Sequence, residues 1–213
     1  MTAQGTLALF RGDHASGVAL FTRSAQLFQH INREYKAVIP LGNVAEVYYM
    51  QGRLQDAIDR AKRALAICER NGEPVETAWL LCNLGNYYLA LGDEDSATSF
   101  TRDALPIALD VGDEWQAFCC IETFARISHA RGETEIAARL VGYAAGRLAA
   151  INLPRQPYEE QLMTGFTRDL RTALGPERLE RYLTEGRLLS REAVLALVYS
   201  RSSKAFPQTS LAS

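Results

Sequence analysis

Four cysteines and three histidines are the residues of this 213-residue chain best suited to metal or redox chemistry. Two of the cysteines, Cys119 and Cys120, are adjacent, whereas zinc sites space their ligands as C-x-x-C. Neighbouring residues of a helix point about 100° apart, so an adjacent pair does not chelate one ion. We interpret the two as small buried side chains of a helix.

The other two cysteines, Cys68 and Cys82, do not complete a disulfide framework. Unpaired thiols are typical of a reducing compartment, so we expect a cytoplasmic protein. Cys82 and Cys119 both lie near the start of predicted helices, which leaves a redox pair in a groove as an alternative.

Neither histidines nor acidic residues form a recognisable catalytic or metal-binding pattern. The acidic stretch GDED at residues 92–95 is interpreted as a turn and a helix start, because it lacks the further oxygen ligands of a calcium loop. The histidines are far apart and have no cysteine or carboxylate at ligand spacing: His14, His30 and His129. We therefore expect no catalytic residue, no cofactor and no metal.

The charge of the chain does not indicate a nucleic-acid or membrane partner. The formal net charge is −2, with 13 basic and 18 acidic residues over 1–146 and 10 basic and 7 acidic over 147–213. Such a mild asymmetry is typical of solvated helix faces. No apolar run approaches the roughly 18 residues that span a bilayer.

A 40-residue period organises the chain and predicts its helices. Glycines recur at Gly12, Gly52, Gly92 and Gly132, and a glycine or asparagine follows each by 20 residues, at Asn32, Gly72, Gly112 and Asn152. Both residue types tolerate the left-handed backbone that ends a helix, which costs other residues about 1–2 kcal/mol. The spacing predicts helices of about 17 residues joined by short turns.

Within a period, large apolar residues flank a small one on a single helix face. In NLGNYYLALGD, residues 83–93, Leu84 and Tyr88 lie on the same face as Gly85. The neighbouring periods place Ala45 and Ala125 at the small position. We expect the partner helix to approach closely there.

This pattern resembles the tetratricopeptide repeat, whose usual period is 34 residues. The resemblance implies an all-α, right-handed superhelical solenoid of antiparallel helix pairs, with about four repeats over residues 1–152. The longer period is that of the version found in large bacterial regulators. The first repeat is degenerate, because its first helix begins only at Met1.

After residue 152 the period breaks at LPRQP, residues 153–157. We expect helices over 158–174, from 176, and over 191–200, forming a cap on the last repeat across 153–200. The end of the chain, 201–213, is predicted to be disordered.

The C-terminal stretches AARLVGYAAGRLAA and YLTEGRLLSREAVLALV resemble the closing segment of large bacterial ATP-dependent transcriptional regulators of the LuxR and STAND type. The resemblance implies a non-catalytic protein- or peptide-interaction module, the sensor or scaffold part of a transcriptional or signalling regulator. No GxxxxGK[ST] loop or helix-turn-helix is evident, so no direct nucleic-acid contact is expected. The alternatives are a small-ligand or peptide-pheromone receptor that switches by solenoid curvature, and an enzyme with a site in the concave groove.

In this family the first helix of each repeat lines the concave groove, where we expect a protein or peptide partner. Positions 13, 10, 6 and 3 residues before each turn glycine are predicted to point into it. Their mixture of aromatic, amide, acidic and basic side chains suits an extended peptide or a helix. The predicted groove residues are Ile39, Glu46, Tyr49, Trp79, Cys82, Asn86, Leu89, Glu122, Arg126 and His129.

The N-terminal edge of the array is predicted to be a second contact surface. Repeat arrays bury their apolar faces only by stacking neighbours. Leu7 and Phe10, on the short first helix, are therefore expected to lack a cover. Either an upstream domain or a second copy in a homodimer would provide it.

Overall fold

A computed structural model describes residues 1–151, 155 and 157–199, and every regular element in that part of the chain is helical. The predicted tail and most of the predicted turn at 153–157 lie outside the described residues. The elements are α1 (Thr2–Phe10), α2 (His14–His30), the 3₁₀ turn η1 (Glu34–Ala37), α3 (Val38–Met50), α4 (Leu54–Asn71), α5 (Pro74–Leu91), α6 (Glu94–Asp110), α7 (Glu114–Ala130), α8 (Thr134–Ala150), α9 (Pro157–Leu174), α10 (Pro176–Arg187) and α11 (Arg191–Tyr199).

The predicted helix stops are confirmed at every described position. Six glycines and one asparagine have a positive φ in the turns between helices: Gly12 (76°), Asn32 (54°), Gly52 (74°), Gly72 (68°), Gly92 (84°), Gly112 (71°) and Gly132 (80°). Asn32 is the one described residue other than glycine in this conformation. Asn152, the last predicted stop, lies outside the described residues.

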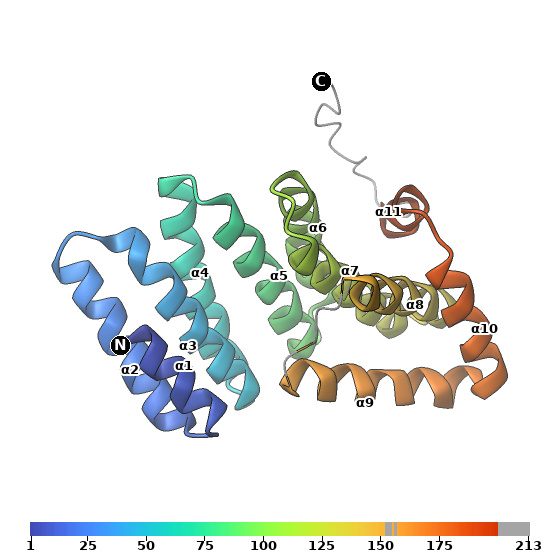
Figure 1. The fold of residues 1–213 in the computed structure, drawn as a ribbon, viewed down its shortest axis with the longest axis horizontal. Helices are drawn as coiled ribbons and strands as arrows, with labels where there is room; N and C mark the ends of the chain where they lie inside the picture. The colour runs from blue at the N-terminus through green and yellow to red at the C-terminus, as the bar shows by residue number, and fades with distance from the viewer. Residues whose placement is uncertain (152–154, 156, 200–213) are drawn as a thin grey trace. The chain divides into compact units, whose positions relative to one another are not determined.

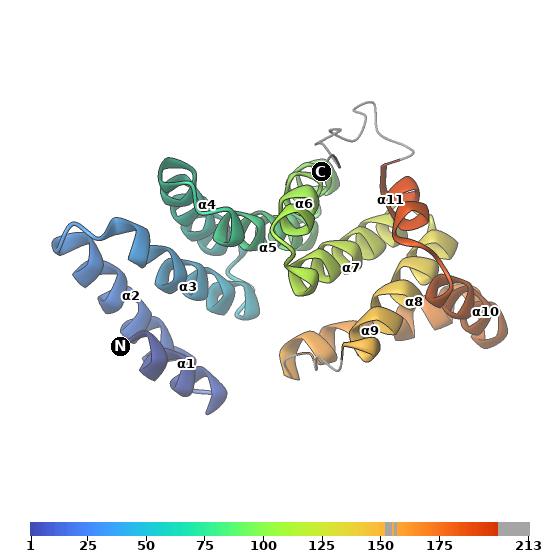
Figure 2. The ribbon, with the colours of Figure 1, turned by 45° about the horizontal axis from the view of Figure 1, so that its top comes forward.

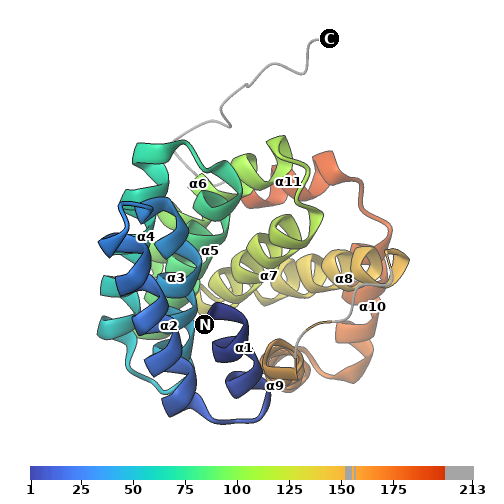
Figure 3. The ribbon, with the colours of Figure 1, turned by 60° about the vertical axis from the view of Figure 1, so that its left-hand side comes forward.

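The chain divides into two compact units, residues 1–123 and 124–213, and the division falls inside α7. In the first unit α1 pairs with α2, α3 with α4, and α5 with α6, and successive pairs also contact each other (Figures 1 and 2). Figure 3 shows α2 and α4 towards the left-hand side of this unit and α1 and α5 to their right. The predicted repeat region continued to residue 152, beyond this division, and its assignment as one domain stays a prediction.

Close helix contacts at small residues hold the first unit together, as the sequence predicted. A Cβ at Gly85 would overlap the Thr101 hydroxyl of α6 and lie 3.2 Å from the Ala97 carbonyl oxygen. Ala45 at the equivalent position of α3 is fully buried. The small side chain lets two helix backbones approach, so more apolar surface is removed from water along both helices.

The start of α3 differs from the prediction of evenly long helices. Residues 34–37 form the 3₁₀ turn η1, and α3 begins only at Val38. Pro40 explains the late start, because proline has no backbone N–H and is tolerated best in the first turn of a helix, where that donor has no intrahelical partner. Pro106, by contrast, lies inside α6, which continues to Asp110.

The second unit is built on the contact between α8 and α10. A Cβ at Gly142 would overlap the backbone of Leu183, and one at Gly186 would overlap the backbone of Arg139. The Arg139 guanidinium also donates to the Glu185 carboxylate at 2.8 Å. Helices α9 and α11 contact α8 as well.

Candidate binding groove

The first helices of two successive hairpins, α3 and α5, present equivalent residues 40 positions apart. Ile39 and Trp79 share one register position, and Tyr49 and Leu89 share another. Ile39 is 47% exposed. The other three are half-buried, as are Glu46 and Asn86 between them. These six residues form the first-helix face, a partly accessible surface that combines apolar and polar side chains.

Trp79 is seated on a glycine of the preceding hairpin. The ring lies so close to Gly42 that a Cβ on that residue would overlap the outer atoms of the indole. Gly42 is buried in α3, where glycine costs about 1 kcal/mol relative to alanine. The space it leaves positions a large aromatic side chain at the surface of the first-helix face.

Tyr49 is held by an aromatic neighbour across the same two helices. Its ring centroid lies 4.8 Å from that of Tyr87, with an angle of 34° between the planes. Tyr87 is buried in α5, so Tyr49 packs on a fixed support. Aromatic side chains that are positioned in advance lose little conformational entropy on binding a partner.

Asn86 connects the first-helix face to the middle of α7. Its amide nitrogen donates to the Cys82 carbonyl at 3.2 Å, and its oxygen lies 3.1 Å from the Thr123 hydroxyl. That hydroxyl is also 2.8 Å from the Cys119 carbonyl, so one proton is shared between two acceptors. Asn86 therefore joins two hairpins, and contact with a partner would come in addition to this role.

Cys82 does not reach the surface, and the prediction that it lines the groove is wrong. It is 1% exposed, because its side chain faces α7 rather than solvent. Its sulfur lies 3.9 Å from the Thr123 hydroxyl. Burial, together with the neighbouring Cys82 thiol, raises the pKa of the fully buried Cys120. Both thiols are interior groups.

Glu122, Arg126 and His129 lie on α7, on both sides of the division between the units. Glu122 is a half-buried member of the first unit. His129 belongs to the second, where its Nδ1 lies 3.2 Å from the Thr134 hydroxyl and its ring packs edge-on against Phe166, 5.6 Å between centroids. The first-helix face belongs to the first unit, and the contribution of Arg126 and His129 stays a prediction.

Sequence reasoning missed Thr123, although the period carried a signal for it. Nine residues before the turn glycine, the three complete first helices have Asn43, Asn83 and Thr123, a polar residue each time. A recurring polar residue among buried apolar positions indicates a hydrogen bond between neighbouring helices.

Two further types of feature are absent from the part of the chain that the structure describes. No group of three or more histidine, cysteine or acidic residues within that part of the chain could hold a metal ion. None of its helices is both long enough and apolar enough to cross a bilayer.

Stacked helical hairpins with positive-φ turns and a mixed, partly exposed first-helix face define a helical-repeat scaffold. The family model for the tetratricopeptide repeat matches residues 1–70 and 36–110, more than half of the chain. The chain therefore belongs to the tetratricopeptide-repeat family. Members of this family are generally non-catalytic scaffolds that bind proteins or peptides.

Solved structures support the same fold. The chain is similar to the TPR-like repeats of a Podosopora anserina putative kinesin light chain, at 17% identity and a TM-score of 0.61 over 94% of this chain and 95% of that one. A single-substitution variant of that protein gives 16% identity and a TM-score of 0.62, with 92% of each chain covered. No curated protein sequence matches the chain significantly. The fold is thus an all-helical, tetratricopeptide-like solenoid.

Proposed function

We propose that the first-helix face of residues 1–123 binds an extended peptide or a helix of a partner protein. The observation that carries the proposal is the row of Ile39, Trp79 and Tyr49, which places partly exposed apolar groups on adjacent helices. Interfaces draw most of their binding energy from a few such anchors. Glu46 and the polar atoms of Asn86 lie among them and would give the peptide a direction.

We further propose that the chain is the sensor or scaffold part of a bacterial transcriptional or signalling regulator in the cytoplasm. The C-terminal resemblance to such regulators supports this context, and its two stretches contain Gly142 and Gly186. Those glycines lie at the contact of α8 and α10, so the two stretches act as one packing unit. The four free cysteines agree with a reducing compartment.

Two buried thiols are poor candidates for a catalytic nucleophile. Burial raises the pKa of Cys68 to about 11, and Cys120 is shifted in the same direction. A catalytic cysteine needs the opposite shift, because the thiolate is the nucleophile.

Site-specific photo-crosslinking tests the proposed groove. A benzophenone amino acid at position 39 is expected to crosslink a defined protein when the purified chain is added to a native lysate. The matched control is position 27, since Leu27 is 46% exposed but lies on the second helix α2. Equal yields of the same product from both positions would reject the groove.

The N-terminal edge of the array stays a predicted second contact surface. Phe10 is 69% exposed and Leu7 is also exposed, as the sequence predicted. We propose a second copy of the chain as the cover. Light scattering across micromolar concentrations would show whether the chain is a dimer. We expect the wild-type chain to be a dimer and the Phe10→Glu variant to be a monomer. A wild-type chain that is strictly monomeric would contradict this proposal.

A further inference from the structure

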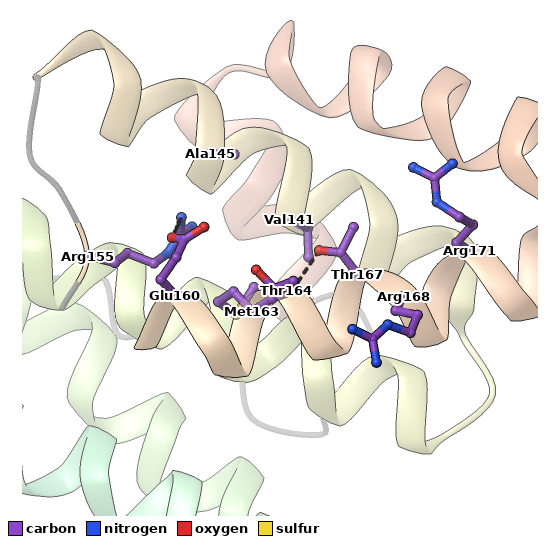
Figure 4. Close-up of a pocket in the computed structure, with 9 residues that line it drawn as sticks. All are labelled: Val141, Ala145, Arg155, Glu160, Met163, Thr164, Thr167, Arg168 and Arg171. Atoms are coloured by element: carbon purple, nitrogen blue, oxygen red, sulfur yellow. Dashed lines mark hydrogen bonds and ion pairs between the residues drawn. The ribbon is translucent and has the colours of Figure 1, made fainter. Parts of the chain in front are cut away.

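An open pocket of about 410 Å³ lies between α8 and α9, within the second unit. Its volume falls in the range of about 300–1,000 Å³ that is usual for small-molecule sites. All of its lining residues come from these two helices and from Arg155 just before α9 (Figure 4). The pocket is separate from the first-helix face, and nothing in the proposed peptide binding uses it.

The pocket has an apolar side. Val141 and Ala145, one turn apart on α8, face Met163 of α9 (Figure 4). Val141 and Met163 are buried. These groups offer a ligand a surface that excludes water, and each CH₂ buried there would contribute about 0.8 kcal/mol.

The rim of the pocket is basic. Arg168 and Arg171 are exposed on α9, and neither forms an ion pair with a described residue. At the other end, Arg155 is only 15% exposed and its Nη1 lies 3.4 Å from the Glu160 carboxylate. The lining thus holds three guanidinium groups and one carboxylate.

Two threonines complete the polar part of the lining. The Thr167 hydroxyl donates to the Met163 carbonyl at 2.8 Å, so it offers a ligand only an acceptor. Thr164, one turn earlier, is exposed on the same face of α9. Figure 4 shows the Arg168 and Arg171 side chains pointing away from each other, so an anion in the pocket would take its donors from one of these two guanidinium groups and from the Thr164 hydroxyl.

We propose that this pocket binds a small organic anion, a carboxylate or phosphate group attached to a short apolar chain. The guanidinium fork matches both head groups, because each presents oxygens that accept two parallel hydrogen bonds. The apolar chain lies against Val141, Ala145 and Met163. Neutral alcohols and ions without an apolar chain each satisfy only half of the lining, so they bind more weakly.

Methyl NMR of the full chain tests this site directly. The sequence has three methionines, and only Met163 lines the pocket; Met1 and Met50 serve as internal references. With ¹³C-methyl-methionine labelling, sodium hexanoate or hexyl phosphate is expected to shift the Met163 resonance saturably. Hexanol and acetate are expected to bind at least fivefold more weakly than hexanoate, and Met163→Leu assigns the resonance.

Arginine variants separate the proposed site from unspecific binding. At least one of Arg168→Gln and Arg171→Gln is expected to weaken hexanoate about three- to tenfold, whereas Arg147→Gln, exposed on α8 and outside the pocket, leaves the affinity unchanged. Both α9 side chains are exposed, so the variants should keep the melting profile of the parent. An unchanged Met163 resonance with both anions, equal binding of hexanol, or equal weakening by Arg147→Gln would overturn the proposal.

Discussion

The indole of Trp79 on α5 lies against the Cα of Gly42 on α3, in a space that only a residue without a side chain leaves open. This contact joins two hairpins at the surface of the first-helix face. It also fixes the direction of the largest aromatic group on that face. The stacking of the hairpins and the shape of the proposed binding surface therefore depend on the same pair of residues.

The substitution Gly42→Ala is expected to displace Trp79 while leaving the fold stable. Only the outer ring atoms meet the new methyl group, and the side chain can rotate away. Alanine gains about 1 kcal/mol of helix propensity, which offsets the lost contact, so we expect a net change within about 1 kcal/mol. Tryptophan emission in a Trp115→Phe background should shift to the red, whereas Gly165→Ala, with open space around it, should leave the spectrum unchanged. An unshifted spectrum would show that Trp79 is not seated as described.

The glycine at the contact of α8 and α10 is expected to respond differently. A methyl group at Gly142 meets the backbone of Leu183, which cannot rotate away, so Gly142→Ala should destabilise the protein by about 1–3 kcal/mol. Gly165→Ala, inside α9 with nothing within 4 Å of the added Cβ, should stabilise it by up to about 1 kcal/mol. Urea unfolding of both variants checks the pair. Equal effects would mean that helix propensity, and not the close contact, governs position 142.

Stability should depend on pH through the cap of α6. The Ser96 backbone N–H donates to Asp93 at 3.0 Å and the Ser96 hydroxyl at 2.7 Å, and these bonds lower the pKa of the Asp93 carboxyl below its ordinary value of 3.8. A lowered folded-state pKa adds stability above pH 4 that is lost as the pH falls through the folded value.

Melting temperatures from pH 7 to 2.5 test this cap. The difference between the wild-type chain and Asp93→Asn should be largest near neutral pH and should vanish in acid. Asp169→Asn is the control, because that carboxylate accepts no hydrogen bond from a described residue. A difference for Asp93→Asn that stays constant down to pH 2.5 would argue against a charged cap.

Thiol labelling should distinguish Cys119 from the other cysteines. Cys119 is half-buried, whereas Cys68, Cys82 and Cys120 are buried. Burial raises the pKa of Cys68 to about 11, so little thiolate is present at pH 8. We expect one thiol to react quickly with an aromatic disulfide reagent in the native protein and four after denaturation. Cys119→Ser should remove the fast phase; its persistence would show that a thiol described as interior is accessible.

The hairpins could be predicted because their determinants are local. A glycine or asparagine is needed wherever the backbone turns with a positive φ, and this requirement does not depend on the neighbouring helices. Gly72 and Asn32 satisfy it at equivalent turns, which is why the period alone located both. The close approach at Gly85 was predictable for a similar reason, since a small residue between large ones indicates where two helices meet.

The depth and neighbours of individual groove residues could not be predicted in this way. The register fixes the angle of a side chain around its helix but not how far the next hairpin covers it. Cys82 was therefore placed in the groove although it is buried, and the contact of the Trp79 ring with Gly42 was not predicted. The pocket between α8 and α9 could not be predicted either, because the 40-residue period breaks between these two helices.

The affinity of a peptide for substituted first-helix faces tests whether this face is the binding surface. A peptide selected against the wild-type chain and measured by calorimetry should bind Ile39→Glu at least tenfold more weakly, because a buried carboxylate would replace an apolar anchor. The same peptide should bind Leu27→Glu, on the opposite helix layer, with unchanged affinity. Equal affinity for wild type and Ile39→Glu, with weakening by Leu27→Glu, would place binding on the second helices and contradict binding at the first-helix face.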